Sequence, residues 1–194
     1  MKQEQIILPS WLQNRFIVLI GLMGAGKTRL GRILAESLKL PFIDTDIEIE
    51  KAAGITIEEI FNNFGETYFR NGEQKVINRV LNGEPSILAT GGGAFMTSVT
   101  RKKIEKFGVS IWLRADINLL VKRTESRSGR PLLKNGNRRE ILSKLMRERY
   151  PVYSEADIIF NISDEPASVT AKKLIKILNT TKSVQKRSDA NNYG

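Results

Sequence analysis

The sequence predicts an α/β fold in which a five-stranded parallel sheet carries helices on both faces. Three observations support this prediction. Five short apolar runs recur along the chain, segments with helical spacing separate them, and glycine or proline stands at several of the expected boundaries. Strands that alternate with helices in this way pair in parallel and are buried beneath those helices.

The apolar runs are expected to form the buried strands. They are residues 16–20, 41–43, 86–89, 109–113 and 158–162. The segments with helical spacing are residues 27–38, 47–53, 57–64, 66–81, 98–107, 116–124, 138–150 and 166–178. Gly54, Gly83 and Gly108 stand where helices should stop, and Asp164-Glu165-Pro166 offers a cap, an acidic first turn and a proline at the start of the last helix.

The length of the chain favours one domain. Its 194 residues, of which 41% are hydrophobic, suffice for one well-buried core and are few for two. We expect this domain at residues 15–178, with an extension at 1–14 and a disordered basic tail at 179–194. Trp11 and Leu12 of the extension are expected to pack on the surface of the domain.

The composition excludes several kinds of chemistry. The chain has no cysteine and no histidine, so disulfides, thiol nucleophiles and ordinary zinc sites are not expected, and carboxylates, lysines and hydroxyls remain for catalysis. No apolar run approaches the roughly 20 residues of a membrane span, and the first residues lack the pattern of a signal peptide. We therefore expect a soluble, cytoplasmic protein without a membrane partner.

The net charge of +10 is unevenly distributed. Basic residues are in excess between Lys122 and Arg149 and again from Lys172 onward, whereas residues 44–59 are acidic. A basic segment opposite an acidic one is typical of an enzyme that holds phosphates with one part and positions Mg²⁺ and a hydroxyl with another. Nucleic-acid binding is the alternative, but no stacking-aromatic motif accompanies the arginines, so we do not expect it.

Residues 21–28 carry the most specific motif of the chain. They match the pattern G-x-x-x-x-G-K-[ST], directly after the first apolar run and at the start of a helical pattern. In such a loop the backbone N–H groups surround phosphate oxygens, the lysine reaches the β- and γ-phosphates, and the hydroxyl is placed to bind Mg²⁺. The pattern predicts binding of a nucleoside triphosphate, ATP, and the residues expected to bind it are Gly24, Ala25, Gly26, Lys27, Thr28 and Arg29.

Asp44 and Asp46 follow the second expected strand directly. The carboxyl ends of parallel strands line the ligand crevice of such a sheet, so both carboxylates should lie near the phosphates. We assign Asp44 to the Mg²⁺ side together with Thr28, and Asp46 to an acceptor hydroxyl, which it orients or deprotonates. The alternative for Asp46 is a structural one, in which it caps the helix that begins at Ile47.

Gly91, Gly92 and Gly93 follow the third expected strand. Three glycines in a row let the main chain approach another group closely or adopt positive φ, and at this place they would allow backbone N–H contact with a small polar substrate. A plain tight turn is the alternative.

Arg70 and Glu73 stand three residues apart, on one face of an expected helix. In one interpretation Glu73 aims the Arg70 guanidinium at a substrate carboxylate, because arginine binds carboxylates with two parallel hydrogen bonds. In the other, the two form an ordinary surface ion pair. The spacing alone does not decide between them.

Two further arginines are candidates for the site. Residues 126–137 contain two glycines and a proline and show no sustained period, so we expect a loop and a candidate lid, in which Arg130 could lie over the phosphates. Its alternative is a solvated loop arginine. Arg149 is expected in the last turn of a helix that ends at Pro151, where it could simply complement the helix dipole.

Taken in order, these motifs resemble those of the bacterial shikimate kinases over roughly residues 15–162. The resemblance implies a sheet of the P-loop, nucleoside-monophosphate-kinase type, with substrate-binding helices at about 47–81, and transfer of the ATP γ-phosphate to the 3-hydroxyl of shikimate. By this resemblance Lys27, Asp46 and Arg130 are catalytic, and Arg123 lies beside the adenine. The residues expected to bind shikimate are Asp46, Arg70, Gly91, Gly92, Gly93 and Arg149.

The resemblance also implies Mg²⁺ as cofactor, and we expect a monomer. Two alternatives stay open at this point. A related kinase could accept gluconate or a nucleoside monophosphate, and a protein of a different class could bind nucleotide together with RNA or a partner without phosphate transfer.

Overall fold

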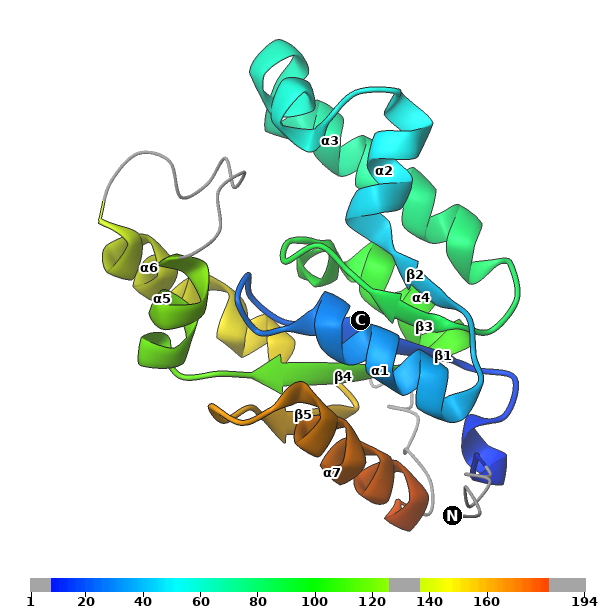
Figure 1. Cartoon of the computed structure of the whole chain (residues 1–194). Helices are drawn as coiled ribbons and strands as arrows, with labels where there is room; N and C mark the ends of the chain where they lie inside the picture. The colour runs from blue at the N-terminus through cyan, green and yellow to red at the C-terminus, as the bar shows by residue number, and fades with distance from the viewer. Residues whose placement is uncertain (1–7, 126–136, 182–194) are drawn as a thin grey trace, which may run out of the picture.

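A five-stranded parallel sheet forms the centre of the structure, a computed structural model that describes residues 8–125 and 137–181 (Figure 1). The strand order is β2-β3-β1-β4-β5, as neighbours in the sheet. The strands are β1 (Phe16–Ile20), β2 (Phe42–Asp44), β3 (Ile87–Ala89), β4 (Gly108–Arg114) and β5 (Ile158–Asn161). All pairings are parallel, so the predicted fold class is confirmed.

The helices follow the predicted order with small shifts at their ends. They are η1 (Ser10–Leu12), α1 (Lys27–Leu38), α2 (Thr45–Ala53), α3 (Ile57–Leu81), η2 (Ala94–Met96), α4 (Ser98–Phe107), α5 (Ile117–Glu125), α6 (Arg138–Tyr153) and α7 (Ala167–Thr180). The two helices expected at 57–64 and 66–81 form α3, which is broken at Gly65, where φ is 77°.

Local sequence explains where several helices begin. Thr56 and Glu59 form a capping box at the start of α3, in which each side chain accepts a hydrogen bond from the backbone N–H of the other residue. Asp44 caps α2, and Asn137 caps α6 by accepting from the N–H of Arg139. A side-chain acceptor at these places replaces the carbonyl partner that the first N–H groups of a helix lack.

The prediction that a helix ends at Pro151 is wrong. α6 continues to Tyr153, and the N–H of Ser154 still bonds to the carbonyl of Tyr150. A proline removes a single backbone donor, and Pro151 is exposed, so water can reach the carbonyl of Arg147 that loses its partner. Burial of the Tyr153 side chain, which is fully enclosed, holds the last turn in place.

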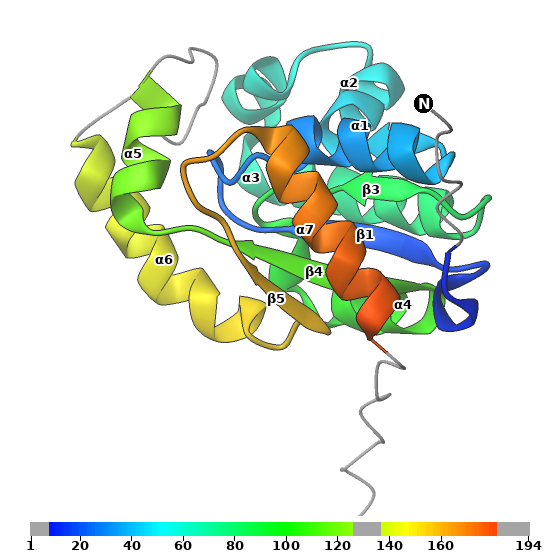
Figure 2. The same cartoon turned by 60° about the horizontal axis from the view of Figure 1, so that its bottom comes forward.

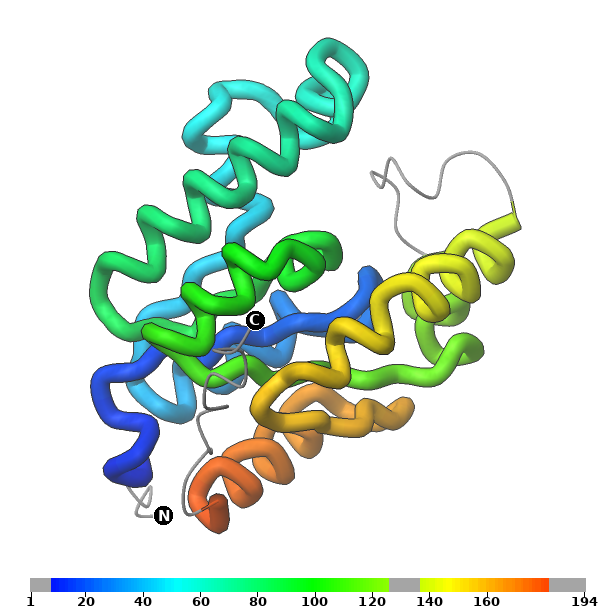
Figure 3. The backbone as a smooth tube through the Cα atoms, turned by 180° about the vertical axis from the view of Figure 1, so that it is seen from behind, coloured from blue at the N-terminus to red at the C-terminus, as the bar shows by residue number. Residues whose placement is uncertain are grey.

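Helices cover the sheet from both sides. α1 and α7 pack against each other on one face (Figures 1 and 2), and α4 and α6 lie on the other (Figure 3). All residues of β1 are buried, as expected for a central strand. Leu12, expected on the surface of the domain, is only 1% exposed and belongs to the main core. No helix in the described part of the chain has both the length and the apolar character needed to cross a membrane.

α2 and the first half of α3 project beyond the sheet as an arm (Figure 1). A second, smaller hydrophobic cluster of Ile49, Ile60, Phe69 and Val76 holds α2 against α3 and extends from the arm into the second half of α3. Since its buried side chains are separate from the main core, the arm has an apolar centre of its own.

Leu34→Ala should lower the free energy of unfolding by about 2–5 kcal/mol, because Leu34 of α1 is completely buried and its removal leaves a cavity. Urea denaturation followed by circular dichroism measures the change. Glu36→Ala, at an exposed position of the same helix, is the matched control and should stay within about 0.5 kcal/mol of the unaltered protein. Equal effects of the two variants would contradict the packing of α1.

Candidate active site

The loop between β1 and α1 has the backbone of a phosphate-binding loop. Gly21, Gly24 and Gly26 adopt φ of 143°, 88° and 93°. Gly26 is the N-cap of α1 and supplies no side-chain cap, so the first N–H groups of the helix remain available to an anion. The Lys27 ammonium bridges the loop, because it donates to the carbonyls of Gly21 at 2.7 Å and Leu22 at 3.1 Å.

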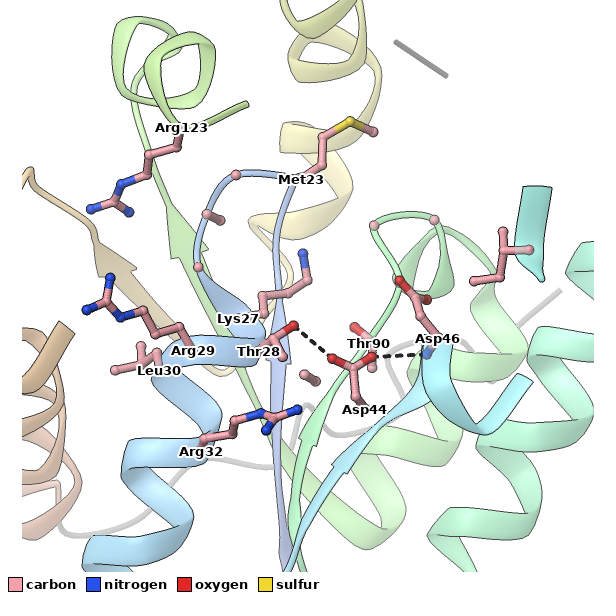
Figure 4. A pocket seen from close by; sticks show the side chains of 18 of the residues that line it. Met23, Lys27, Thr28, Arg29, Leu30, Arg32, Asp44, Asp46, Thr90 and Arg123 are labelled. Carbon is pink, nitrogen blue, oxygen red and sulfur yellow. Dashed lines mark hydrogen bonds between the residues drawn. The ribbon is translucent and has the colours of Figure 1, made fainter. Parts of the chain in front are cut away.

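Thr28 and Asp44 meet beside this loop. The Thr28 hydroxyl donates to Oδ2 of Asp44 at 2.8 Å (Figure 4). The other carboxylate oxygen of Asp44 accepts from the N–H of Asp46 at 3.1 Å and thereby caps α2. The capping role weighed for Asp46 therefore belongs to Asp44, because the helix begins two residues earlier than expected.

Asp46 is accessible within the cleft and close to other carboxylates. Partial desolvation by the surrounding walls raises the pKa of Asp46 above its ordinary value, and the charge of Asp44 raises it further. The charges of Lys27 and Arg70 act in the opposite direction. Asp46 therefore holds its negative charge less readily than an ordinary aspartate, which makes it a stronger proton acceptor once ionised.

Arg70 is held by two acidic side chains of its own helix. Its guanidinium donates to Glu73 at 2.7 Å and to Glu66 at 3.1 Å. Glu73 is 2% exposed, so this is no surface ion pair, and burial raises the pKa of Glu73 against the lowering effect of Arg70. A short, charge-assisted hydrogen bond to a buried carboxylate leaves the Arg70 guanidinium little freedom to turn away. The structure thus favours the interpretation in which Glu73 fixes the direction of Arg70.

Each glycine of the turn after β3 lies against a different charged group. A Cβ at Gly91 would come within 2.5 Å of Oε1 of Glu73, and one at Gly92 within 3.1 Å of the Arg149 guanidinium. A Cβ at Gly93 would overlap the guanidinium of Arg70. None of the three residues has positive φ. A side chain at any of the three would displace the end of a charged side chain that lies against the turn, so close approach of these groups accounts for the glycines better than a plain tight turn does.

Arg149 is buried at 8% exposure and approaches this turn from α6. Together with Arg70 it places two guanidinium groups beside Gly92 and Gly93. Because both groups are largely withdrawn from water, a carboxylate between them would be bound more strongly than at the surface.

Arg29 and Arg123 line the other end of the cleft. Figure 4 shows both on one side of Lys27, with Asp44 and Asp46 on the other. Arg123 donates to the carbonyl of Ser163 at 3.1 Å and lies 3.9 Å from Asp164. Asp164 in turn accepts from Lys122 at 2.6 Å. The start of the β5–α7 connection is thereby tied to α5 beside the phosphate-binding loop.

A single cavity of about 1040 Å³ connects these groups. Its volume is sufficient for two ligands side by side. Every predicted site residue that the structure describes lines it, namely Gly24, Ala25, Gly26, Lys27, Thr28, Arg29, Asp44, Asp46, Arg70, Gly91, Gly92, Gly93, Arg123 and Arg149. Arg130 and all but the last residue of the predicted lid lie outside the described residues.

Two hydroxyl residues next to the site were not predicted from the sequence. Thr45 accepts a hydrogen bond from the N–H of Gly91 at 3.0 Å, and Tyr153 donates one to the carbonyl of Gly92. A hydroxyl between two aspartates was the available signal for Thr45. For Tyr153 the signal was its place four residues after Arg149, which puts both on one face of a helix.

Comparison with known proteins identifies close relatives of this arrangement. The family model for shikimate kinase matches residues 23–179. A shikimate kinase from Paramagnetospirillum magneticum is 52% identical over 173 residues, which cover 89% of each chain. A solved shikimate kinase from Acinetobacter baumannii, in complex with shikimate, is similar with a TM-score of 0.84 at 35% identity, over 88% of this chain and 96% of that one. A gluconokinase from Sinorhizobium meliloti, at 17% identity and a TM-score of 0.56 over 86% and 92% of the two chains, shares the fold alone.

Asp46→Asn should raise the melting temperature at pH 7, because the folded cleft disfavours the ionised carboxylate. The gain should stay below about 4 °C, since water in the cleft screens the charge. Folding raises this pKa, so the advantage should shrink as the pH falls through the folded pKa and vanish below 3.8, where the carboxyl is protonated in both states. Calorimetric scans between pH 3.5 and 8 measure this difference.

Asp164→Asn is the control, because the pKa of Asp164 is shifted in the opposite direction from that of Asp46. Hydrogen bonding to Lys122 lowers the pKa of Asp164, so this substitution should give no gain in melting temperature at pH 7. If Asp46→Asn lost stability at pH 7 as well, the Asp46 carboxylate would have to be favourably solvated or paired in the folded state.

Proposed function

The chain belongs to the shikimate kinase family of ATP-dependent phosphotransferases, and on this premise we propose how it transfers the γ-phosphate of ATP to the 3-hydroxyl of shikimate. One observation carries the proposal. The same cavity joins a phosphate-binding loop to Arg70 and Arg149 beside the triple glycine, and Asp46 lines it as well. Such a cleft suits the phosphorylation of an alcohol that bears a carboxylate, a step in the pathway to the aromatic amino acids.

ATP would bind at the end formed by the loop and Arg123. The N–H groups of Gly24, Ala25 and Gly26 and the start of α1 would hold the phosphates, as oriented backbone amides do in such loops. Lys27 would exchange its carbonyl partners for the β- and γ-phosphate oxygens. Arg29 and Arg123 lie where the nucleoside would leave the loop, and Arg123 would rest beside the adenine.

Thr28 and Asp44 fit a Mg²⁺ ion. Their oxygens are 2.8 Å apart, and adjacent ligands of octahedral Mg²⁺ are separated by about 2.9 Å. Within the described residues no group of three or more metal-binding side chains exists. That suits Mg²⁺, which is usually held by one or two carboxylates together with substrate phosphates and water. When bound there, the ion would neutralise charge on the phosphates.

Shikimate would occupy the end formed by the arm and the triple glycine. Arg70 and Arg149 would bind its carboxylate, and Glu73 would keep the Arg70 guanidinium in place. The N–H groups of Gly92 and Gly93 would contact the substrate as well. Gly91 would form the wall of the cavity next to Asp46.

Asp46 would accept the proton of the 3-hydroxyl. As that oxygen bonds to the γ-phosphorus, the bond from this phosphorus to the bridging oxygen breaks and ADP leaves with the electron pair. The raised pKa of Asp46 suits a proton acceptor for an alcohol. Lys27, and Arg130 from the predicted lid, would stabilise charge on the phosphoryl group, so that catalysis consists mainly of positioning and electrostatics.

Three further properties belong to this proposal. We propose that the protein acts as a monomer, in the cytoplasm and without a nucleic-acid partner. Family membership replaces the alternatives of a gluconate or nucleoside monophosphate kinase and of a non-catalytic binding protein.

Lys27→Ala should lower kcat by at least about 100-fold, because it removes the only side-chain cation that the loop itself directs at the transferring phosphate. A coupled assay of ADP release, with and without shikimate, measures this. Lys144→Ala removes an exposed lysine of α6 and should leave the rate unchanged. Near-normal turnover of Lys27→Ala would contradict the assigned role, and ATP consumption by the unaltered protein that did not depend on shikimate would contradict the substrate.

Arg70→Ala should raise the KM for shikimate by about 10- to 100-fold, the range expected for loss of hydrogen bonds to a charged group, with little change in the KM for ATP. Arg79→Ala is the matched control, because Arg79 lies on the same helix and forms an exposed ion pair with Glu48 at 3.0 Å. Steady-state kinetics with each substrate varied in turn distinguishes the two. An unchanged KM for shikimate would show that the Arg70–Glu73 pair serves the structure alone.

A further inference from the structure

The peptide planes of the triple-glycine turn need contacts from outside the turn to keep one direction. Glycine loses more backbone freedom on folding than any other residue, so three in a row leave the peptide planes poorly fixed by their own sequence. Within the described part of the chain, the N–H groups of Gly92 and Gly93 form no hydrogen bond. Both residues line the cavity. These donors can serve a ligand only if the peptides that carry them are held in one direction.

Backbone hydrogen bonds fix part of the turn. The N–H of Ala94 bonds to the carbonyl of Gly91 at 3.1 Å, and the N–H of Met96 bonds to that of Gly93 at 3.0 Å. A trans peptide is planar, so its C=O and the following N–H point in opposite directions. The bond to the Gly91 carbonyl therefore sets the direction of the Gly92 N–H. Among the described residues no backbone N–H donates to the carbonyl of Gly92, so the direction of the Gly93 N–H needs another source.

Two hydroxyl groups supply the missing anchors. Tyr153 of α6 donates to the carbonyl of Gly92, which fixes the plane that carries the Gly93 N–H. Thr45 of α2 accepts from the N–H of Gly91 at 3.0 Å, which fixes the plane before it. The two residues approach the turn from elements far apart in the sequence, and both are completely buried.

Tyr153 is itself held firmly. Its ring lies 5.9 Å from that of Trp112, edge to face, and 6.2 Å from that of Tyr150. Burial raises the pKa of Tyr153 to about 12, against the lowering effect of the Arg149 charge, so the hydroxyl remains a donor throughout the neutral range.

We propose that Tyr153 and Thr45 are positioning residues that aim the N–H groups of the triple-glycine turn at the carboxylate-bearing substrate. Neither side chain lines the cavity, so they act through the turn and not by contact with the substrate. This inference rests on the proposed function, which places shikimate against Gly92 and Gly93. ATP is held by a different loop, so the two hydroxyls should influence one substrate and not the other.

Tyr153→Phe, Thr45→Val and Thr45→Ser test this proposal. Phenylalanine keeps the ring and removes the hydroxyl, valine keeps the shape of threonine without its acceptor, and serine keeps the acceptor. Tyr153→Phe and Thr45→Val should each raise the KM for shikimate about five- to tenfold, as expected for loss of one neutral hydrogen bond, with the KM for ATP within about twofold of the original. Thr45→Ser should restore the original value.

Tyr150→Phe is the matched control. Tyr150 lies on the same helix, contacts Trp112 as well, and donates its hydroxyl to the carbonyl of Ala115 at 2.6 Å, away from the turn. Burial also raises its pKa to about 12. Tyr150 is less buried than Tyr153 and its hydroxyl holds a carbonyl outside the turn, so loss of this hydroxyl should leave the KM for shikimate unchanged.

The possible results distinguish an effect that acts through the glycine turn from one that acts through Arg149 or on the binding of both substrates. Unchanged shikimate KM values in both Tyr153→Phe and Thr45→Val would overturn the proposal, as would equal increases in the KM for both substrates. An effect of Tyr153→Phe alone would assign the change to its neighbour Arg149 and also overturn it. If Tyr153→Phe did not fold, the comparison of Thr45→Val with Thr45→Ser would decide whether the proposal holds.

The proposed function fails in a different way. An unaltered protein that does not phosphorylate shikimate would refute that function, and this inference with it. An active unaltered protein with unaffected variants would refute this inference alone.

Discussion

The pairing of β3 between β1 and β2 is the constraint on which the site depends. Leu19 and Asp44 both pair with Ala89, so the three strands end at the same edge of the sheet. The phosphate-binding loop, the Asp44–Asp46 segment and the triple glycine begin at those ends and must therefore meet. A slip of one residue in β3 would turn its side chains to the opposite face and displace the glycines from the arginines.

Bringing these loops together costs stability, because the cleft concentrates groups that water would otherwise solvate. Desolvation raises the pKa of both Asp46 and Glu73, and Oε1 of Glu73 is buried with no hydrogen-bond partner among the described residues. Arg70 and Arg149 compensate part of this cost. A loss of stability of this kind is common where a site keeps polar groups ready for a ligand.

Local patterns predicted most of the fold and the motifs that line the cavity, whereas contacts between distant segments could not be predicted. The bounds of α1 and α4 agree with the sequence, because apolar period and boundary residues lie within each segment. Pro151 was misread as a helix end because burial of Tyr153, a tertiary effect, outweighs one missing donor. The partners of Thr45 and Tyr153 are glycines 46 and 61 residues away, for which one sequence holds no signal. The role of Arg130 stays a prediction.

The segment Asp44-Thr45-Asp46 shows why the middle residue of such a motif has a role of its own. At a helix start, successive residues are rotated by about 100°, so adjacent side chains diverge. Asp44 turns to Thr28 and caps the helix, Thr45 turns to Gly91, and Asp46 is left facing the cleft. The two carboxylates point in different directions, and the hydroxyl between them ties the helix start to the neighbouring strand end. A pair of aspartates with an apolar residue between them would lack that bond, and the distance from Asp46 to the glycine turn would then depend on packing alone.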